Sequence, residues 1–126
     1  MPDASIRQGP GRMLVAVYGI FALAATSRSA VQLATRFDQA PVAYLLSAFA
    51  AVVYIVATVT LATGSRRIAF VACGIEFIGV VTVGLVSLFV PHVFPDATVW
   101  SFFGIGYGFI PLVLPVLGLW WLRKTA

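Results

Sequence analysis

The segment 67–90 decides the fold, and it reads RIAFVACGIEFIGVVTVGLVSLFV. It is apolar over nearly its whole length, and after the opening arginine it holds one full charge, Glu76. At ~1.5 Å per residue, a helix of this length crosses the ~30 Å hydrocarbon layer of a bilayer and places Glu76 near its middle. A carboxylate there is costly, so we expect Glu76 to face protein partners or a wet cavity and to be neutral if unpaired.

The composition of the whole chain is typical of an integral membrane protein. Hydrophobic residues make up 61% of its 126 positions and charged residues only 10%. A soluble domain of this size cannot bury so much apolar surface, so the surplus is expected to face lipid in a single membrane domain over 1–126. The net charge of +4 is spread in ones and twos at the ends of the apolar runs, so nucleic acid is not an expected partner.

Four apolar runs predict an all-α fold, an antiparallel bundle of four transmembrane helices. Asp38 and Asp96 stand where the second and fourth helices would need a cap. Residues 13–25 also resemble the core of a signal peptide, but the helical pattern continues beyond them, so we expect an uncleaved span. A polar tail is expected over 1–11, and the helices are expected over about 12–36, 41–63, 67–90 and 98–122.

The basic residues predict the orientation of the bundle. Six of the eight lie at one end of the expected helices, and the end richer in Arg and Lys normally stays in the cytoplasm, so both termini are expected there. Trp100 at one level and Trp120 with Trp121 at the other fit the aromatic belts of the two interfaces. The six are Arg7, Arg12, Arg66, Arg67, Arg123 and Lys124, and the remaining two are Arg28 and Arg36.

Each expected helix carries one polar stripe, and in lipid such stripes turn toward one another. The face of the third helix that carries Glu76 also holds Cys73, and the fourth helix offers Trp100 and Tyr107. A small-molecule or lipid-like ligand is expected where the stripes meet. The expected ligand-binding residues are Glu76, Arg28, Gln32, Tyr54, Tyr107 and Tyr18.

Two of these residues allow alternative roles. Arg28 either turns inward to pair with Glu76 or extends outward to lipid headgroups, since it lies about a third of the way in. Glu76 is either a structural hydrogen-bond anchor or a functional carboxyl.

The expected fourth helix has one face with almost no side-chain bulk. Small residues allow close packing within the bundle or across a homo-oligomer, whereas prolines remove hydrogen bonds and bend a helix. Tight packing is the main interpretation, and a moving hinge or an unwound binding segment is the alternative. The face consists of Gly104, Gly108, Pro111, Pro115 and Gly118.

No residue pattern indicates catalysis, a metal or a cofactor. The only cysteine, Cys73, lies inside an apolar run, and the only histidine, His92, lies in an expected loop. No spacing resembles a haem, zinc, P-loop or dinucleotide site, and one carboxyl without a nucleophile and base is a poor start for an enzyme. We therefore expect a non-enzymatic protein with no cofactor and no metal.

Five short motifs stand along the chain: Gly11-Arg12, Ser27-Arg28-Ser29, Arg36-Phe37-Asp38 with Ala40-Pro41, Pro95-Asp96-Ala97-Thr98-Val99-Trp100, and Gly106-Tyr107-Gly108-Phe109. Together they resemble small four-span membrane proteins of actinobacteria over nearly the whole chain. The resemblance implies a multi-pass protein of the plasma membrane and implies no activity. In size and in its single intramembrane glutamate the chain is also similar to small multidrug resistance transporters. Their essential glutamate lies in the first helix, however, so no residue role is carried over from them.

The expected function is to bind or move a small or lipid-like molecule at the internal polar site. The alternative is a structural or accessory subunit that packs against a larger membrane complex through the Gly and Pro face of the fourth helix. Membrane lipid is an expected partner in both cases. The two functions differ in whether the polar side chains converge on a cavity or on one another.

Cysteine labelling tests the orientation. Gln39→Cys and Ser65→Cys place a thiol in the first and second turns, at opposite ends of the expected helices. An impermeant maleimide added to intact cells should label Gln39→Cys and leave Ser65→Cys unlabelled, because the basic end stays inside. Cys73 lies inside an apolar run and should not react, so the wild-type protein serves as the unlabelled control. Labelling of Ser65→Cys alone would place the termini outside.

Overall fold

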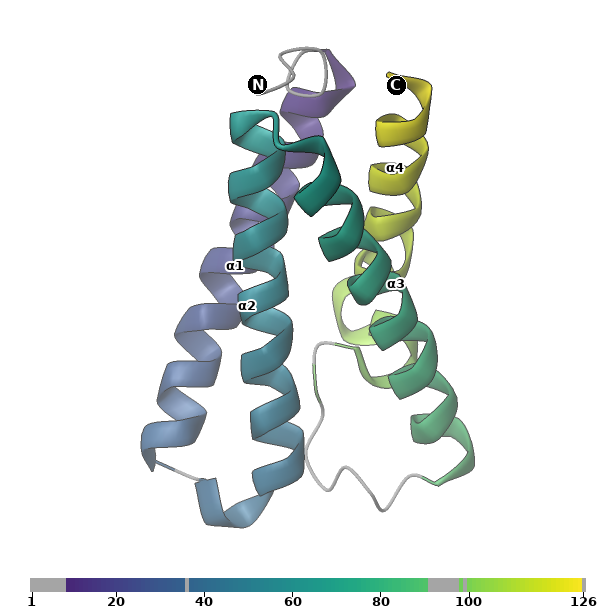
Figure 1. Cartoon of the computed structure of the whole chain (residues 1–126). Helices are drawn as coiled ribbons and strands as arrows, with labels where there is room; N and C mark the ends of the chain where they lie inside the picture. The colour runs from purple at the N-terminus through teal and green to yellow at the C-terminus, as the bar shows by residue number, and fades with distance from the viewer. Residues whose placement is uncertain (1–8, 36, 91–97, 99, 126) are drawn as a thin grey trace.

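The computed structural model describes residues 9–35, 37–90, 98 and 100–125. Over these residues the chain is helical and contains no strand, which confirms the expected helical bundle. In chain order (Figure 1) the elements are α1 (Pro10–Thr35), the 3-10 helix η2 (Phe37–Gln39), α2 (Pro41–Thr63), α3 (Arg66–Phe89), the 3-10 helix η4 (Ser101–Tyr107) and α4 (Ile110–Lys124).

Three of these helices are long and apolar enough to cross a membrane. They are α1, α2 and α3, with 26, 23 and 24 residues. The last helix, α4, has 15 residues, or about 22 Å of helix, which is less than the ~30 Å hydrocarbon layer. The expected continuous helix over 98–122 is therefore wrong, whereas the first three expected helices agree with the structure to within two residues at each end.

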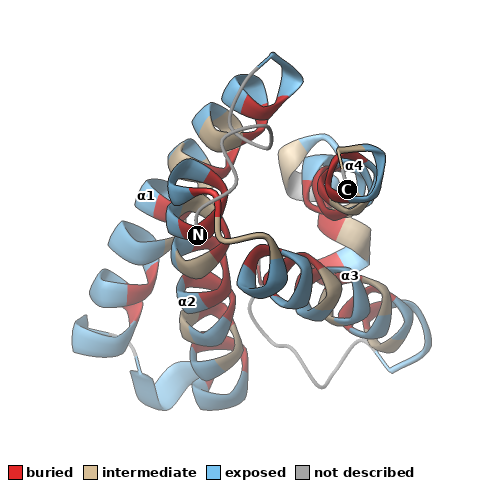
Figure 2. Ribbon diagram, turned by 45° about the horizontal axis from the view of Figure 1, so that its top comes forward, coloured by how far each residue is buried: buried red, intermediate tan, exposed pale blue. Residues whose placement is uncertain are grey.

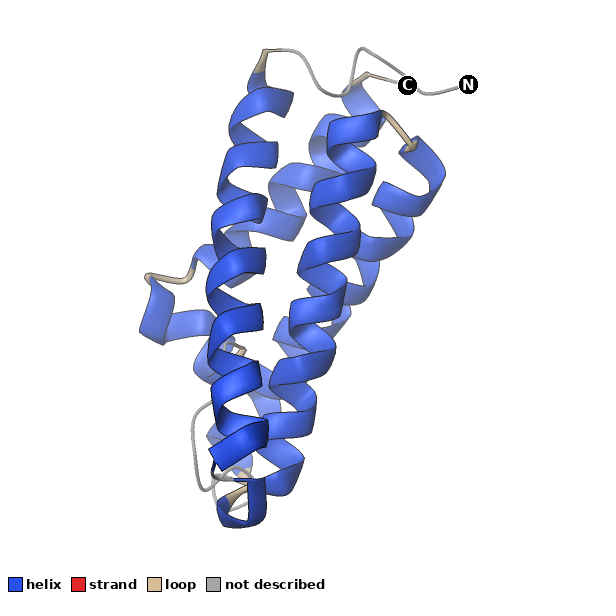
Figure 3. Cartoon of the chain, turned by 90° about the vertical axis from the view of Figure 1, so that its left-hand side faces the viewer, coloured by secondary structure: helices blue, strands red, loops and turns tan. Residues whose placement is uncertain are grey.

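The helices form two hairpins that share one end. α1 packs beside α2 and α3 beside α4, and a short turn at residues 64–65 joins α2 to α3. The start of α1, this turn and the end of α4 all lie at the same end of the bundle (Figures 1 and 3). We call it the terminal end, and we call the opposite side, where α1 meets η2, the far end.

The outer surface of the bundle is apolar, and several polar side chains lie inside. Ile20, Val52 and Ile78 are each more than half exposed, whereas Gln32 and Glu76 are buried. Figure 2 shows the exposed residues on the outward sides of the helices and the buried ones on the inward sides. Such a surface costs free energy in water and suits a hydrocarbon solvent, which supports a membrane protein.

The turns between the helices are explained by their sequences. Pro41 begins α2, where a missing N–H costs no helical hydrogen bond, and Gly64 ends it with a left-handed φ of 80°. The N-cap of α2 is Ala40, without a side-chain cap. Asp38 lies in η2 instead, so its expected capping role is wrong, and Asp96 lies outside the described residues.

Arg66 joins the start of α3 to the end of α4. Its guanidinium donates hydrogen bonds to the carbonyl oxygen of Leu122 and, at 2.9 and 3.1 Å, to the carbonyl and hydroxyl oxygens of Thr125. The last carbonyls of a helix have no donor within the helix and carry partial negative charge. Arg66 therefore caps α4 as well as contributing to the basic terminal end.

The expected fourth helix is broken because part of its backbone is left-handed. A non-glycine residue with positive φ is strained by roughly 1–3 kcal/mol, so contacts elsewhere must hold it in place. One group of residues with positive φ lies inside η4, and a second lies between η4 and α4. The residues with positive φ in these two groups, between 52° and 82°, are Phe102, Phe103, Gly104, Gly108 and Phe109.

Pro111 explains where the regular helix resumes. It is the second residue of α4, where no hydrogen bond is lost. Within a helix over 98–122, its ring would meet the carbonyl of Tyr107. Gly104 and Gly108 thus precede α4, and they do not share a helical face with Pro111, Pro115 and Gly118, contrary to expectation.

Two aromatic rings hold the segment around η4 against α3. A Cβ at Gly79 would lie 2.5 Å from Cζ3 of Trp100, and a Cβ at Gly84 would overlap the ring of Phe103. Only glycine leaves room for these rings at the surface of α3. Trp100 is 1% exposed, so it lies inside the bundle and not in the interfacial belt where it was expected.

Alanine at two glycines of α3 should have opposite effects on stability. Gly79→Ala displaces the Trp100 ring and should lower the free energy of unfolding by roughly 1–3 kcal/mol. A Cβ at Gly74 meets nothing within 4 Å, so Gly74→Ala should gain up to about 1 kcal/mol from helix propensity. Unfolding in detergent micelles measures both changes. Equal effects would contradict the packing of Trp100 on Gly79.

Candidate functional site

Three helices bring a polar side chain to one place in the bundle. Glu76 of α3, Tyr18 of α1 and Tyr54 of α2 are all 0% exposed. Counted from the helix ends at the terminal end, they lie 10, 8 and 9 residues in, or about 12–15 Å. They therefore share one level, close to the middle of a ~30 Å hydrocarbon layer.

Two further side chains complete this group. The Tyr18 hydroxyl and the Cys73 sulfur are hydrogen-bonded at 3.4 Å, and the Trp100 indole N–H donates to the Tyr54 hydroxyl at 3.2 Å. Because indole can only donate, Tyr54 keeps its own proton for another acceptor. We define the polar cluster as Tyr18, Tyr54, Cys73, Glu76 and Trp100.

α4 closes the polar cluster with a glycine. A Cβ at Gly118 would lie 2.8 Å from the Cys73 sulfur and 3.4 Å from the Tyr18 hydroxyl. The expected packing role of this glycine thus corresponds to a contact within the chain. Gly108, by contrast, has open space around its Cα, and its left-handed φ of 63° is what requires glycine there.

The carboxyl group of Glu76 is the unusual feature of the polar cluster. Within the described part of the chain, neither of its oxygens has a hydrogen-bond partner. The hydroxyls of Tyr18 and Tyr54 face this carboxyl at the edge of hydrogen-bonding range, so a small side-chain movement would let either hydroxyl donate to it. Buried polar atoms normally have partners, so this carboxyl has unused capacity for a proton, a cation or a hydrogen-bond donor.

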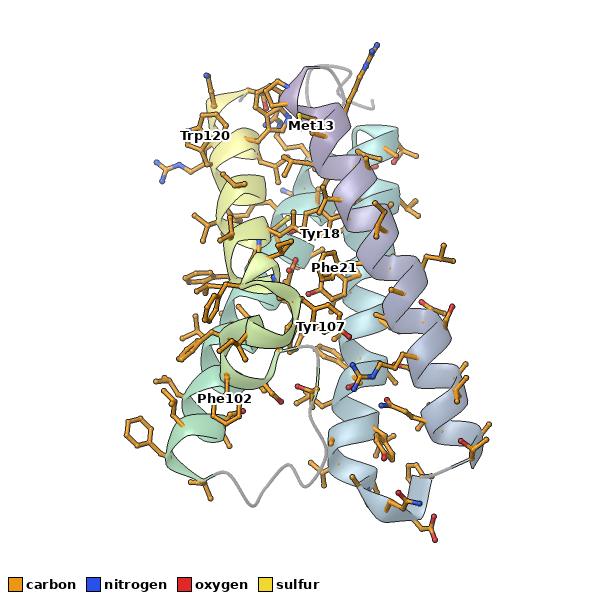
Figure 4. The ribbon with its side chains drawn as sticks, turned by 180° about the vertical axis from the view of Figure 1, so that it is seen from behind. Met13, Tyr18, Phe21, Phe102, Tyr107 and Trp120 are labelled. Carbon is orange, nitrogen blue, oxygen red and sulfur yellow. The ribbon has the colours of Figure 1, made fainter. Side chains whose placement is uncertain are left out.

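Arg28 belongs to a second group, which adjoins the polar cluster. Its guanidinium donates to the Tyr107 hydroxyl at 2.7 Å, so α1 is tied to η4. The Tyr107 ring lies 5.6 Å from the Phe21 ring, and the Phe21 ring lies 5.7 Å from that of Tyr54. Figure 4 shows Tyr18, Phe21 and Tyr107 gathered between α1 and the green segment of η4. The aromatic rings of Tyr107, Phe21 and Tyr54 thus connect Arg28 to the polar cluster.

Gln32 lies apart from both groups. It is 14 residues beyond Tyr18 on α1, or about 21 Å along the helix axis. Its side chain is buried, and its Oε1 atom has no partner among the described residues. The six residues expected at one site therefore divide into three places, with Glu76, Tyr18 and Tyr54 together.

Sequence reasoning missed part of the polar cluster and its support. Trp100 was expected at the interface, and the role of Gly79 in admitting its ring was not recognised. The available signal was the three glycines of α3 at positions 74, 79 and 84, since glycines in a helix mark a surface where another segment can approach closely. Among the described residues, no three His, Cys, Asp or Glu side chains come together.

Comparison with protein-family models, with curated proteins and with solved structures found no match for this chain. The resemblance to small four-span proteins of actinobacteria therefore stays a prediction. Inference about function rests on the polar cluster, on the non-helical segment that contacts it and on the surface of the helices.

Double-mutant cycles distinguish the two possible partners of Arg28. Arg28→Gln and Tyr107→Phe remove the same hydrogen bond, so their effects on unfolding should be coupled by roughly 0.5–3 kcal/mol. Arg28→Gln and Glu76→Gln should be additive within about 0.5 kcal/mol, because the two side chains are not paired. Unfolding in detergent gives all the values. A larger coupling with Glu76 than with Tyr107 would contradict the observed geometry.

Proposed function

We propose that this chain is a non-enzymatic protein of the plasma membrane whose polar cluster binds, and exchanges with the membrane, a small lipophilic cation. The observation that carries the proposal is the Glu76 carboxyl, which is fully buried and whose two oxygens have no hydrogen-bond partner among the described residues. An intramembrane carboxyl is costly, and such residues mark ion and substrate sites in membrane proteins.

The surroundings of the carboxyl favour a cation over other ligands. Tyr18, Tyr54 and Trp100 present aromatic rings next to the one acidic group of the polar cluster. Aromatic faces attract quaternary and other organic cations, most strongly where water is excluded. A bound cation pairs with the carboxylate form of Glu76, so we expect cation binding to strengthen as the pH rises.

The non-helical segment supports movement of the bound molecule. Trp100 enters the polar cluster from the start of η4, where the backbone is left-handed and strained. In many transporters a discontinuous helix contributes to the substrate site at mid-membrane, because irregular backbone is tolerated only where protein or a cavity surrounds it. The Arg28–Tyr107 hydrogen bond holds this segment closed against α1.

The proposed topology places the terminal end in the cytoplasm. The basic residues of the described helices are concentrated at that end, where Arg12, Arg66, Arg67, Arg123 and Lys124 lie. α1, α2 and α3 each cross the membrane, and the fourth crossing is shared by α4 and the folded segment around η4.

The small residues of the expected fourth helix do not support the alternative of an accessory subunit that packs through them. Gly104, Pro111, Pro115 and Gly118 are buried within this chain, and only Gly108 is exposed. These residues therefore do not offer a continuous face to a partner.

Glu76→Gln separates binding from stability. Gln keeps the volume of a neutral carboxyl, so the free energy of unfolding should change by less than about 1.5 kcal/mol. Binding of benzyltrimethylammonium, measured calorimetrically in proteoliposomes, should weaken by roughly 30-fold or more, because the charged partner is lost.

Ser87→Ala is the matched control for this experiment. Ser87 is also buried on α3, but its hydroxyl donates to the carbonyl of Val83 in its own helix, so its removal should leave cation binding unchanged. If Glu76→Leu matches the wild type in both stability and binding, the carboxyl is neither an anchor nor a site, and the proposal is wrong.

A further inference from the structure

A second site lies on the outside of the bundle, between the first half of α1 and the length of α4. Here the two helices leave a groove of about 360 Å³ whose lining side chains are all apolar. Met13 and Val17 line it from α1, and Val113 and Leu117 line it from α4. None of the residues of the polar cluster lines this groove, so the two sites are separate.

The groove is open to the surroundings of the bundle. Met13 is 72% exposed and Leu117 is 45% exposed, whereas Leu14 and Leu114 at its floor are buried. In the membrane placement proposed above, its opening faces the hydrocarbon of the lipid layer at the terminal end. Its occupant must therefore be apolar along most of its length.

One end of the groove is basic. Trp120 lines the groove and also an adjoining depression that it shares with Arg123 and Lys124. The Lys124 ammonium lies 4.8 Å from the centre of the Trp120 ring, and Figure 4 shows Met13 and Trp120 at this same end. Neither α1 nor α4 contains an acidic residue. A ligand that follows the groove thus passes from apolar walls to the two cations Arg123 and Lys124, which no acidic residue of α1 or α4 neutralises.

The charge beside the groove favours a phospholipid over an apolar helix. Arg123 and Lys124 line the adjoining depression, and an anionic headgroup complements them, whereas an apolar helix does not. A single alkyl chain is narrow enough to lie along the groove.

We propose that the groove binds one acyl chain of an anionic phospholipid, whose phosphate group lies against Arg123 and Lys124. The apolar walls select the chain, and the two cations select a headgroup with net negative charge. This inference rests on the proposed membrane placement of the bundle but not on the proposed role of Glu76.

Lipid retention tests the proposal on the full-length protein in detergent. Purified protein is mixed with dioleoylphosphatidylglycerol, dioleoylphosphatidylcholine or inorganic phosphate, and lipid adducts are counted by native mass spectrometry alongside the shift in melting temperature. Phosphatidylglycerol should be retained as a single adduct and should raise the melting temperature, whereas phosphatidylcholine and phosphate should do neither.

Two pairs of variants locate the site. Leu117→Trp fills the groove and should abolish the adduct, whereas Leu85→Trp alters a residue of α3 with the same 45% exposure outside the groove and should not. Joint replacement of Arg123 and Lys124 by Gln should weaken binding roughly thirtyfold, at about fivefold per cation near the membrane surface. Arg67→Gln, an exposed cation on another helix, should have little effect.

Several results would overturn the proposal. Equal retention of the two lipids would remove headgroup recognition, and an equal effect of phosphate would indicate a free anion site. Loss of binding in Leu85→Trp as well as Leu117→Trp would indicate non-specific adhesion, and a dimer broken by Leu117→Trp would make a second copy the occupant. Glu76→Gln should retain the lipid, so failure of this proposal and failure of the cation site are distinguishable.

Discussion

The bundle depends on the rule that polar groups in a hydrocarbon layer must find their partners within the protein. The hydroxyls of Thr58, Thr60 and Thr63 obey it by bonding to carbonyls one turn earlier in α2. Within the described part of the chain, the buried side-chain atoms that break the rule belong to Ser29, Gln32 and Glu76. Glu76 leaves two oxygens without partners, at the level where water is scarcest. The threonine hydroxyls of α2 follow the rule, so the two oxygens of Glu76 that break it are informative about function.

α3 is the element against which α2, η4 and α4 are placed. It supplies Glu76 and Cys73 to the polar cluster, and two of its three glycines, Gly79 and Gly84, accept the rings of Trp100 and Phe103. It also contacts α2, η4 and α4. A regular, rigid helix thus carries the acidic group, while a strained segment lies against it. This arrangement suits a site in which Glu76 stays fixed on α3 and the segment around η4 moves.

The sequence predicted the three long helices well because length and apolar composition determine them locally. The expected range 41–63 coincides with α2, and the other two differ by one or two residues. The break near η4 was not predicted, since Phe102 and Phe103 are not turn-forming residues and adopt positive φ only through contacts with distant parts of the chain, such as Gly84. The grouping of Tyr18, Tyr54 and Glu76 could be predicted because it depends on helix faces and depth. The partner of Arg28 could not, because it depends on where η4 folds.

The contacts of α4 bear on the order in which the bundle can be completed during synthesis. Arg66 and Cys73 lie in α3, but the carbonyl groups that Arg66 caps and the glycine that covers Cys73 belong to α4, which leaves the ribosome last of the described helices. Until then the guanidinium of Arg66 remains hydrated at the membrane surface, and the polar cluster lacks one wall. The bundle therefore closes only after α1, α2 and α3 have entered the membrane. A nascent chain arrested before α4 would expose Glu76 to lipid and to quality-control proteases.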